Sequence, residues 1–463
     1  MVAIGPLPAP PERPKAVIVA VHFPRVDDRE FDSSLEELGR LVTTLGYQVV
    51  ARVVQPRSHL EAAAVVGEGK LAELAEITGG TGHVGTTAPK RRDKARLRRE
   101  AEGRDDDDGT DEAEDEDDDV GGPNAKVALV AVDHDISPSQ ARNLERATGV
   151  QVLDRTGVII EIFHRHAKSR EARLQVEIAR LAYTAPRLRE SPGGKERQRG
   201  RGAGEAALEL DRRKVRDRIA ELREELEAVQ RDQDVRRAHR RQARRIALVG
   251  YTNAGKSSLM RALTASEVYV EDKLFATLDT TVRALQPEAK PRILVSDTVG
   301  FIKKLPHDLV ASFKSTLDEA LEASHLLHVV DAADPSWEAQ LEVTQEVLAE
   351  IGANEVPSTL VMNKIDLLEP DELARLRVRL PKAWFVSARD PSDVTTVRQR
   401  IIDIFEESYE QIEVLVPYDR QAVLSEMHDS GRVVDERWEE EGVTVIWRAE
   451  AEAIGRVRSR LRA

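Results

Sequence analysis

A phosphate-binding pattern lies near the middle of the chain. Residues Gly250 to Ser257 follow the spacing G-x-x-x-x-G-K-[ST]. In such a loop the backbone N–H groups close around phosphate oxygens, Lys256 reaches the outer phosphates, and the Ser257 hydroxyl can ligate Mg²⁺. The residues predicted to line this part of a nucleotide site are Gly250, Asn253, Ala254, Gly255, Lys256, Ser257 and Ser258.

A second pattern, D-x-x-G, follows the apolar segment 292–296 and runs from Asp297 to Gly300. The Asp297 carboxylate can hold the Mg²⁺ shell, and the Gly300 N–H can meet the γ-phosphate. Because the segment is apolar and the motif comes at its end, we expect the two residues at the end of a buried strand.

A third pattern predicts which base is bound. Asn363, Lys364 and Asp366 form N-K-x-D after the apolar segment 358–362. The Asp366 carboxylate can accept hydrogen bonds from two guanine donors that adenine lacks, so GTP is favoured over ATP. The pair Ser387 and Ala388 follows another strand-like segment, 383–386, and a backbone N–H there can meet the guanine carbonyl. An ordinary turn at a strand end explains that last pair as well.

The segment 275–281 is rich in threonine. We expect Thr277 to complete Mg²⁺ coordination in the GTP state and to release it after hydrolysis, as in a switch loop. Thr280 and Thr281 are explained equally well as the start of a β-strand. With Thr277 as a second metal ligand beside Ser257, the residues predicted to act on the reaction itself are Lys256, Thr277 and Gly300.

Two positions bear on the rate of hydrolysis. Phe301 stands where many GTPases carry a glutamine that orients the attacking water, and a phenyl ring cannot do this. We therefore expect slow intrinsic hydrolysis that a partner accelerates. Asn253 has two open interpretations: it resembles the potassium ligand of cation-dependent GTPases, and it is also a residue that tolerates a tight turn.

The phosphate-binding loop has the strand–loop–helix context that it requires. The apolar run 245–249 predicts a buried strand, and 258–263 predicts a helix whose N-terminus faces the phosphates. The N-terminal region shows β–α–β order in 16–21, 34–42 and 47–51, followed by the strand 126–132 and a helix that Ser137 caps. Gly67 to Lys70 lacks the full spacing of a phosphate loop and indicates a helix-entry turn.

Apolar residues recur from Leu208 onward, at alternating steps of four and three after Val215, which predicts a coiled-coil seam. They are Leu208, Val215, Ile219, Leu222, Leu226 and Val229. Arginines flank this segment at 187–201 and 236–245, and the first flank is rich in glycine. A solvated helical face explains such arginines, but beside a nucleotide switch a cationic hairpin favours RNA, with affinity that falls as salt rises.

Composition limits the remaining possibilities. With 463 residues, 41% of them hydrophobic, the chain can form three or four domains. The absence of cysteine excludes disulfides and thiolate chemistry and is typical of a reducing cytoplasm. No segment has the length and apolarity of a membrane span or signal peptide, so we expect a cytoplasmic protein.

The net charge of −14 is concentrated in one tract. Residues 102–119 contain thirteen Asp or Glu against one Arg, so the rest of the chain is nearly neutral. Such a tract cannot bury a core, and we interpret it as a disordered insertion. A second interpretation, that it mimics nucleic acid and shields a basic surface, also stands.

Several regions together resemble one family, the HflX ribosome-associated GTPases of the Obg-HflX-like superfamily. The similar stretches are 65–70, 137–145, 154–156, 174–179, 186–188, 204–205, 208–213, the switch segment 277–279 and Phe301. The resemblance implies a GTP-hydrolysing factor whose helical hairpin reaches into the large ribosomal subunit and which splits stalled ribosomes. It also implies that some relatives bind ATP in the N-terminal domain. The acidic insertion and Thr280, where relatives usually carry proline, depart from the family pattern.

The fold class that follows is α/β. We predict a P-loop GTPase domain with a mixed, mostly parallel sheet and helices on both faces, preceded by a small α/β domain and an antiparallel helical coiled-coil hairpin, and followed by a small α/β domain. The predicted bounds are a disordered 1–14, an N-terminal domain 15–165 with an insertion at about 80–124, a hairpin 166–243, a GTPase domain 244–408 and a C-terminal domain 409–463.

The expected partners and cofactors follow from these assignments. They are GTP and GDP, the large ribosomal subunit with its rRNA, Mg²⁺ and, if Asn253 is an ion ligand, K⁺. We expect a monomer. Two alternatives remain: a GTPase that acts in large-subunit biogenesis, and an RNA-binding module whose GTP is structural and hardly turned over.

Overall fold

The computed structural model describes residues 13–84, 127–187, 203–238, 244–265, 274–275, 281–303 and 319–462, with side chains in the long helix for 210–231 only. The chain divides into two compact units, residues 1–158 and 159–463. Most of the predicted acidic insertion lies outside the described residues, as do Thr277, Thr280 and the glycine-rich basic flank after Arg187.

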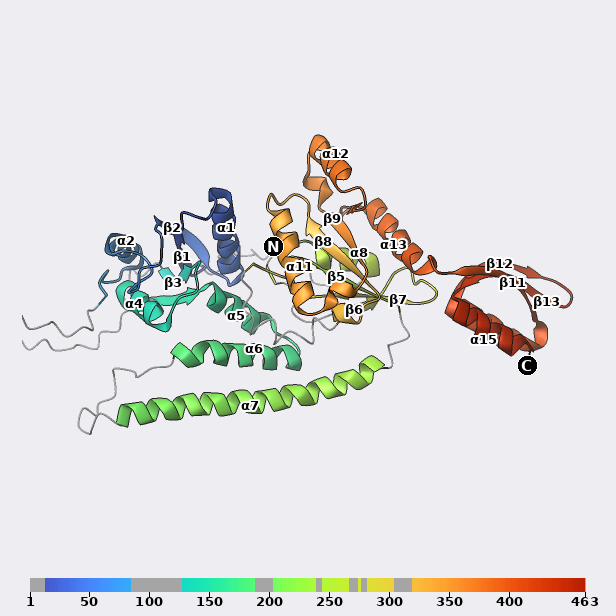
Figure 1. The fold of residues 1–463 in the computed structure, drawn as a ribbon, viewed down its shortest axis with the longest axis horizontal. Helices are drawn as coiled ribbons and strands as arrows, with labels where there is room; N and C mark the ends of the chain where they lie inside the picture. The colour runs from blue at the N-terminus through green and yellow to red at the C-terminus, as the bar shows by residue number, and fades with distance from the viewer. Residues whose placement is uncertain are drawn as a thin grey trace, which may run out of the picture. The chain divides into compact units, whose positions relative to one another are not determined.

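The first unit contains a four-stranded parallel sheet with helices on both faces (Figure 1). Its strand order is β2-β1-β3-β4, and its core joins Leu74 and Leu144 from two helices to one face of the sheet. On the other face, Gly39 lies against Ile18. The elements are β1 Lys15–His22, α1 Asp28–Thr44, β2 Gln48–Pro56, α2 Glu68–Thr78, β3 Val127–Val132, α4 Pro138–Thr148, β4 Gln151–Asp154 and the beginning of α5 Arg155–His166.

Two helix starts predicted from sequence are confirmed. The Ser137 hydroxyl accepts from the backbone N–H of Gln140, and the Ser137 backbone N–H donates to the Gln140 side chain, which forms a capping box with Pro138 in the first turn of α4. Gly67 is the N-cap of α2, so the short glycine-containing segment there is a helix entry. The predicted β–α–β order of the region is also confirmed.

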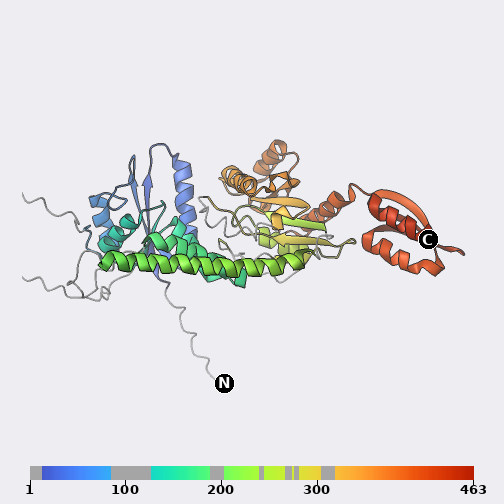
Figure 2. The same ribbon diagram turned by 60° about the horizontal axis from the view of Figure 1, so that its bottom comes forward.

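The second unit contains a helical hairpin made by α6 Arg170–Thr184 and α7 Ala203–Ala238, with the short η1 Ala185–Arg187 between them. Figures 1 and 2 show α6 lying along α7. Leu174 and Ile178 of α6 pack against Leu222, and Ile219 and Leu226 join the cluster. From Ile219 to Val229 the predicted seam therefore packs as a coiled coil does.

Arg244 and Arg245 were counted in the predicted basic flank, but they do not belong to an exposed cationic surface. They begin β5, in agreement with the strand predicted over 245–249. Arg245 is 7% exposed and pairs with Glu322 at 2.5 Å, while Arg244 pairs with Glu450 at 2.9 Å. These two arginines are structural because carboxylates of the same unit already neutralise them.

The part of the second unit that carries the predicted nucleotide motifs is a six-stranded sheet in the order β10-β9-β8-β5-β7-β6, in which only β6 is antiparallel to its neighbour. Helices cover both of its faces (Figure 1). The elements are β5 Arg244–Val249, α8 Lys256–Thr264, β6 Thr281–Ala284, β7 Ile293–Asp297, β8 His325–Asp331, α11 Trp337–Glu350, η2 Ala353–Glu355, β9 Ser358–Asn363, η3 Ile365–Leu367, α12 Pro370–Arg379, β10 Trp384–Phe385 and α13 Pro391–Glu406.

Alternation along the strands explains the two-sided burial. In β5, Ile246 and Leu248 face α8 and α13, whereas Ala247 and Val249 face α11. Strand β8 pairs with both β5 and β9 at the centre of the sheet, and the sequence analysis did not identify it.

The C-terminal part is a three-stranded antiparallel sheet, β11-β13-β12, with two helices on one face. Trp447 is fully buried there and donates to the backbone oxygen of Met427 at 2.8 Å. Its elements are β11 Glu410–Pro417, η4 Tyr418–Arg420, α14 Gln421–Ser430, β12 Gly431–Trp438, β13 Gly442–Ala449 and α15 Ala451–Arg462. In the parts of the chain that are described, no helix combines the length and the apolarity needed to span a bilayer.

Candidate nucleotide site

The four predicted motifs come together because each follows a strand of the same parallel sheet. The phosphate loop follows β5, D-x-x-G closes β7, N-K-x-D closes β9, and the Ser387–Ala388 pair follows β10. The carboxyl ends of parallel strands share one edge of a sheet, where open α/β folds bind ligands. The structure therefore places these residues at one edge, as a nucleotide site requires.

The phosphate loop depends on glycine at both ends. Gly255 has φ +90° and Gly250 has φ +149°, and a Cβ on Gly250 would collide with the backbone oxygen of Val329. Lys256 is the first residue of α8, so the loop ends at a helix N-terminus whose free N–H groups favour an anion.

Lys256 is buried against the loop that it closes. Its ammonium donates to the backbone oxygens of Gly250 at 3.0 Å and Tyr251 at 2.8 Å. Burial lowers the pKa of Lys256 to about 8, and the negative charge of Asp297 opposes this change. Burial also lowers the pKa of His328 on β8 to about 4, and the Lys256 charge adds to the effect, so that histidine is neutral.

The oxygen atoms expected around a metal ion lie together. The Ser257 hydroxyl donates to the Asp297 carboxylate at 2.6 Å, and Asp297 is fully buried. Hydroxyl and carboxylate oxygens beside a triphosphate are the ligand set that Mg²⁺ prefers, so the residues present fit this ion. Thr277, the other expected ligand, lies outside the described residues, and its role stays a proposal.

The loop after β7 is joined to the phosphate loop by backbone hydrogen bonds. Thr252 N–H donates to the Phe301 oxygen at 2.7 Å, and Phe301 N–H donates to the Gly250 oxygen at 3.1 Å. The Phe301 side chain is 2% exposed and packs in the core with Ala247 and Val249. An added Cβ on Gly300 would lie 2.7 Å from the Thr252 Cα, so only glycine fits there without movement.

The base-recognition residues form a connected set. The Asn363 amide donates to the Ala254 oxygen at 2.9 Å and accepts from the Ala388 N–H at 3.1 Å, which ties the phosphate loop to the last motif. Ser387 donates to the Asp366 carboxylate at 2.7 Å and thereby orients it. The Ala388 N–H, expected to meet the guanine carbonyl, is held within this set.

Three residues at this edge were not identified from the sequence. Asp331, at the end of β8, pairs with Lys364 at 2.7 Å. Asp393, on α13, accepts the Ser387 N–H at 2.8 Å. Thr252, in the phosphate loop, is hydrogen-bonded to Phe301 after β7 and to Phe275. The apolar run that precedes Asp331 was a usable signal for the first, whereas nothing local in the sequence marks the other two.

Asn253 has φ +61°, in the left-handed region that asparagine tolerates better than most residues. The turn interpretation of this position thus has a structural basis, and a potassium ligand there stays a proposal. Ser258 is half-buried in the first turn of α8, beside the N-terminal N–H groups.

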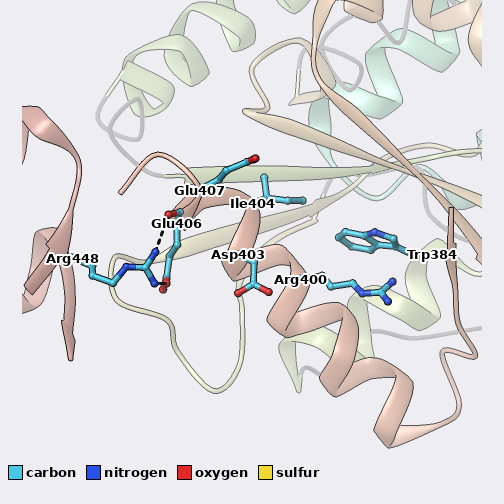
Figure 3. Close-up of a pocket in the computed structure, with 7 residues that line it drawn as sticks. All are labelled: Trp384, Arg400, Asp403, Ile404, Glu406, Glu407 and Arg448. Carbon is cyan, nitrogen blue, oxygen red and sulfur yellow. Dashed lines mark hydrogen bonds and ion pairs between the residues drawn. The ribbon is translucent and has the colours of Figure 1, made fainter. Parts of the chain in front are cut away.

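A pocket of about 590 Å³ lies between α13 and the C-terminal sheet (Figure 3). Arg400 lies over the Trp384 ring at 5.5 Å, and Arg448 pairs with Glu406 at 3.3 Å. Glu406 also pairs with Arg432 at 3.1 Å, so the last turn of α13 is bound to two strands of the C-terminal sheet. The mixed charges of the pocket specify no ligand. The residues that line it attach the C-terminal sheet to α13.

Comparison with known proteins agrees with the geometry. Residues 245–364 match the family described as 50S ribosome-binding GTPase, 166–240 match GTP-binding GTPase Middle Region, and 32–84 with 120–164 match GTP-binding GTPase N-terminal. A GTPase HflX of Gluconacetobacter diazotrophicus is 59% identical over 98% of this chain and 99% of its own. A GTPase HflX of Escherichia coli is 35% identical over 92% and 91%. A GTP-binding protein of Sulfolobus solfataricus, solved with GDP, aligns with a TM-score of 0.41 at 22% identity over 84% and 98%.

Proposed function

The chain belongs to the HflX family of GTPases, and from this premise we propose that its GTP-bound form docks on the large ribosomal subunit and separates stalled ribosomes into subunits. Hydrolysis of GTP then releases the factor. The observation that carries this proposal is the match of 245–364 to the 50S ribosome-binding GTPases within a chain that aligns along 98% of its length with a GTPase HflX. The setting is the cytoplasm, and the acting species is a monomer.

The helical hairpin is long enough to extend into the large subunit. Helix α7 has 36 residues, which corresponds to a length of about 54 Å. Only one side of its described part packs on α6, and the rest carries exposed charged residues such as Arg218 and Glu221. A long rigid helix with basic flanking segments suits insertion between RNA elements, because phosphate contacts tolerate many sequences.

The nucleotide site supplies the difference between states. Lys256 and the N-terminus of α8 hold the outer phosphates, and the Gly300 N–H meets the γ-phosphate, which GDP lacks. Ser257, Asp297 and Thr277 would hold Mg²⁺, which neutralises charge on the phosphates when it is bound. A ligand shifts a conformational equilibrium only through such a difference in contacts, so the γ-phosphate must order the switch loops that face the ribosome.

Phe301 predicts how the enzyme is regulated. Its ring lies in the core, away from any position from which it could orient water. Hydrolysis by the isolated protein is therefore slow, and the docked ribosomal subunit accelerates it by ordering the loops or by supplying a polar group. Potassium is a proposed activator through Asn253.

Sedimentation tests the proposal directly. Intact ribosomes are mixed with the protein and a non-hydrolysable GTP analogue, with GDP, or with the Lys256→Ala variant, and the subunit peaks are compared. We expect separated subunits, with the protein on the large one, only in the first mixture. Val378→Ala, at an 84% exposed position on α12, is the matched surface control and should behave as the parent does.

Two outcomes would overturn the proposal. Association with the small subunit alone would exclude docking on the large one. Intact ribosomes that remain intact, with the protein found only on immature large-subunit particles, would instead favour a role in large-subunit biogenesis. Ribosome-stimulated phosphate release would further exclude an RNA-binding module whose GTP is structural.

A further inference from the structure

Thr252 is one of the four x residues of the phosphate-loop pattern G-x-x-x-x-G-K-[ST]. It contacts the loops on both sides of the expected γ-phosphate position. Its backbone N–H donates to the Phe301 oxygen at 2.7 Å, and its hydroxyl accepts the backbone N–H of Phe275 at 3.0 Å. Thr252 is 6% exposed, so both bonds are shielded from water. Phe275 begins the threonine-rich segment, and Phe301 follows D-x-x-G.

Phe275 is held in an unfavourable conformation by its neighbours. It has φ +58°, in the left-handed region that bulky residues rarely adopt. Its ring is 2% exposed and packs edge-on against Phe163 of α5, with centroids 4.6 Å apart and planes at 76°. Such a backbone persists only where several contacts fix it, and residues of this kind cluster at switches and active sites.

Among the contacts that hold Phe275 in place, the hydrogen bond to the Thr252 hydroxyl is the polar one. The Phe275 N–H is buried, and without an acceptor it would carry the full cost of desolvation. Threonine is β-branched and therefore has few side-chain rotamers, which aims its hydroxyl in one direction. Valine has the same branched shape and lacks the acceptor, so it separates the hydrogen bond from the packing.

We propose that the Thr252 hydroxyl is a positioning group for GTP hydrolysis. By accepting the Phe275 N–H it fixes the start of the first switch loop against the phosphate loop, while its backbone fixes the start of the second loop through Phe301. Phe275 and Phe301 are thereby both held against the phosphate loop, where the γ-phosphate is expected. This inference rests on the GTPase activity alone and is independent of any action on ribosomes.

The test compares Thr252→Val with Thr252→Ser. Single-turnover hydrolysis of saturating GTP should be about 3- to 10-fold slower in the valine variant, as expected for one buried hydrogen bond, and close to the parent in the serine variant. The affinity for GDP should change less than about twofold in both, because the group aligns the loops and does not bind the diphosphate. Thermal unfolding followed by circular dichroism checks that both variants fold.

Amide hydrogen exchange observes the bond without an activity measurement. A peptide that contains Phe275 should exchange faster in Thr252→Val than in the parent, and at the parent rate in Thr252→Ser. Phe163→Leu serves as a second variant: it should also raise exchange in this peptide, since the ring contact is the other restraint.

Four results would overturn the proposal. They are an unchanged or faster hydrolysis rate in Thr252→Val, equal losses in the valine and serine variants, a loss of GDP affinity as large as the loss of rate, and unchanged exchange of the Phe275 peptide. The third would assign Thr252 a purely structural role in the phosphate loop.

Discussion

The buried position of Lys256 predicts that nucleotide affinity depends on pH near neutrality. The surrounding protein lowers the pKa of this lysine from 10.5 to about 8, chiefly through burial. Bound phosphates add negative charge beside the ammonium and must raise that pKa again. Above pH 8 the protein therefore takes up a proton when nucleotide binds, and affinity falls as pH rises.

The size of the effect follows from the pKa. At pH 7 nearly all Lys256 is charged, whereas at pH 9 only about one molecule in ten is, so the apparent affinity for GDP should fall about tenfold, or about 1.4 kcal/mol. The stability of the protein without nucleotide should change in the opposite direction. Between pH 8 and 10.5 the unfolded chain binds more protons at this lysine than the folded chain, so folding becomes more favourable, by at most about 3 kcal/mol.

Calorimetric titration with GDP from pH 7 to 9, in two buffers of different ionisation enthalpy, measures both affinity and proton uptake. Lys256→Arg is the control, because a guanidinium stays charged throughout. Guanine itself begins to lose a proton at the upper end of this range, but it does so equally with both proteins. The reasoning would be refuted if GDP affinity fell with pH equally steeply in the wild type and in Lys256→Arg. Binding of GDP to the wild type without proton uptake at pH 8.5 would refute it as well.

Three further predictions concern single side chains at the site. Asp366→Asn should weaken GDP binding at least tenfold and gain affinity for xanthosine diphosphate, because an amide can donate to the extra base carbonyl; a competition assay that still finds strict guanine preference would contradict base reading by Asp366. Gly300→Ala should slow GTP hydrolysis more than tenfold while GDP affinity holds, since the added methyl would lie 2.7 Å from the Thr252 Cα, and unaltered turnover would show that the loop has room to move. Hydrolysis should be faster in potassium than in sodium. Asn253→Gly keeps the turn at φ +61° but removes the amide, so this variant should abolish the difference. Equal wild-type rates in the two salts would show that Asn253 serves the turn and does not bind potassium.

The arrangement of the nucleotide site follows from sequence where a motif and a strand coincide. The apolar run before Gly250 fixes a strand end, and the same holds before Asp297 and Asn363. Strands that are parallel have their carboxyl ends at one edge of the sheet, so motifs that follow such strands lie at the same edge. This is why the three main motifs could be assembled without knowledge of side-chain contacts.

The features that could not be predicted from the sequence depend on contacts between residues far apart in the chain. Strand β8 was overlooked because no motif follows it, although it lies at the centre of the sheet. Arg244 and Arg245 were counted with an exposed basic flank because their carboxylate partners, Glu450 and Glu322, are more than seventy positions away in the sequence. The hydroxyl of Thr252 likewise acquires its partner only when the chain folds, twenty-three positions downstream.

The contacts within the site also limit the ordering cost of binding a nucleotide. Lys256 rests on backbone oxygens, Ser257 on Asp297 and Ser387 on Asp366, so the side chains that the motifs predict to face phosphate, metal and base are already fixed by the protein. A nucleotide then exchanges one set of hydrogen bonds for another and loses little side-chain entropy. The buried ammonium of Lys256 and the N–H groups of the loop and the start of α8 then both contribute charge or partial charge toward the phosphates. The pH dependence of binding separates the two, because only the ammonium titrates in this range, and a weak dependence would assign the larger share to the N–H groups.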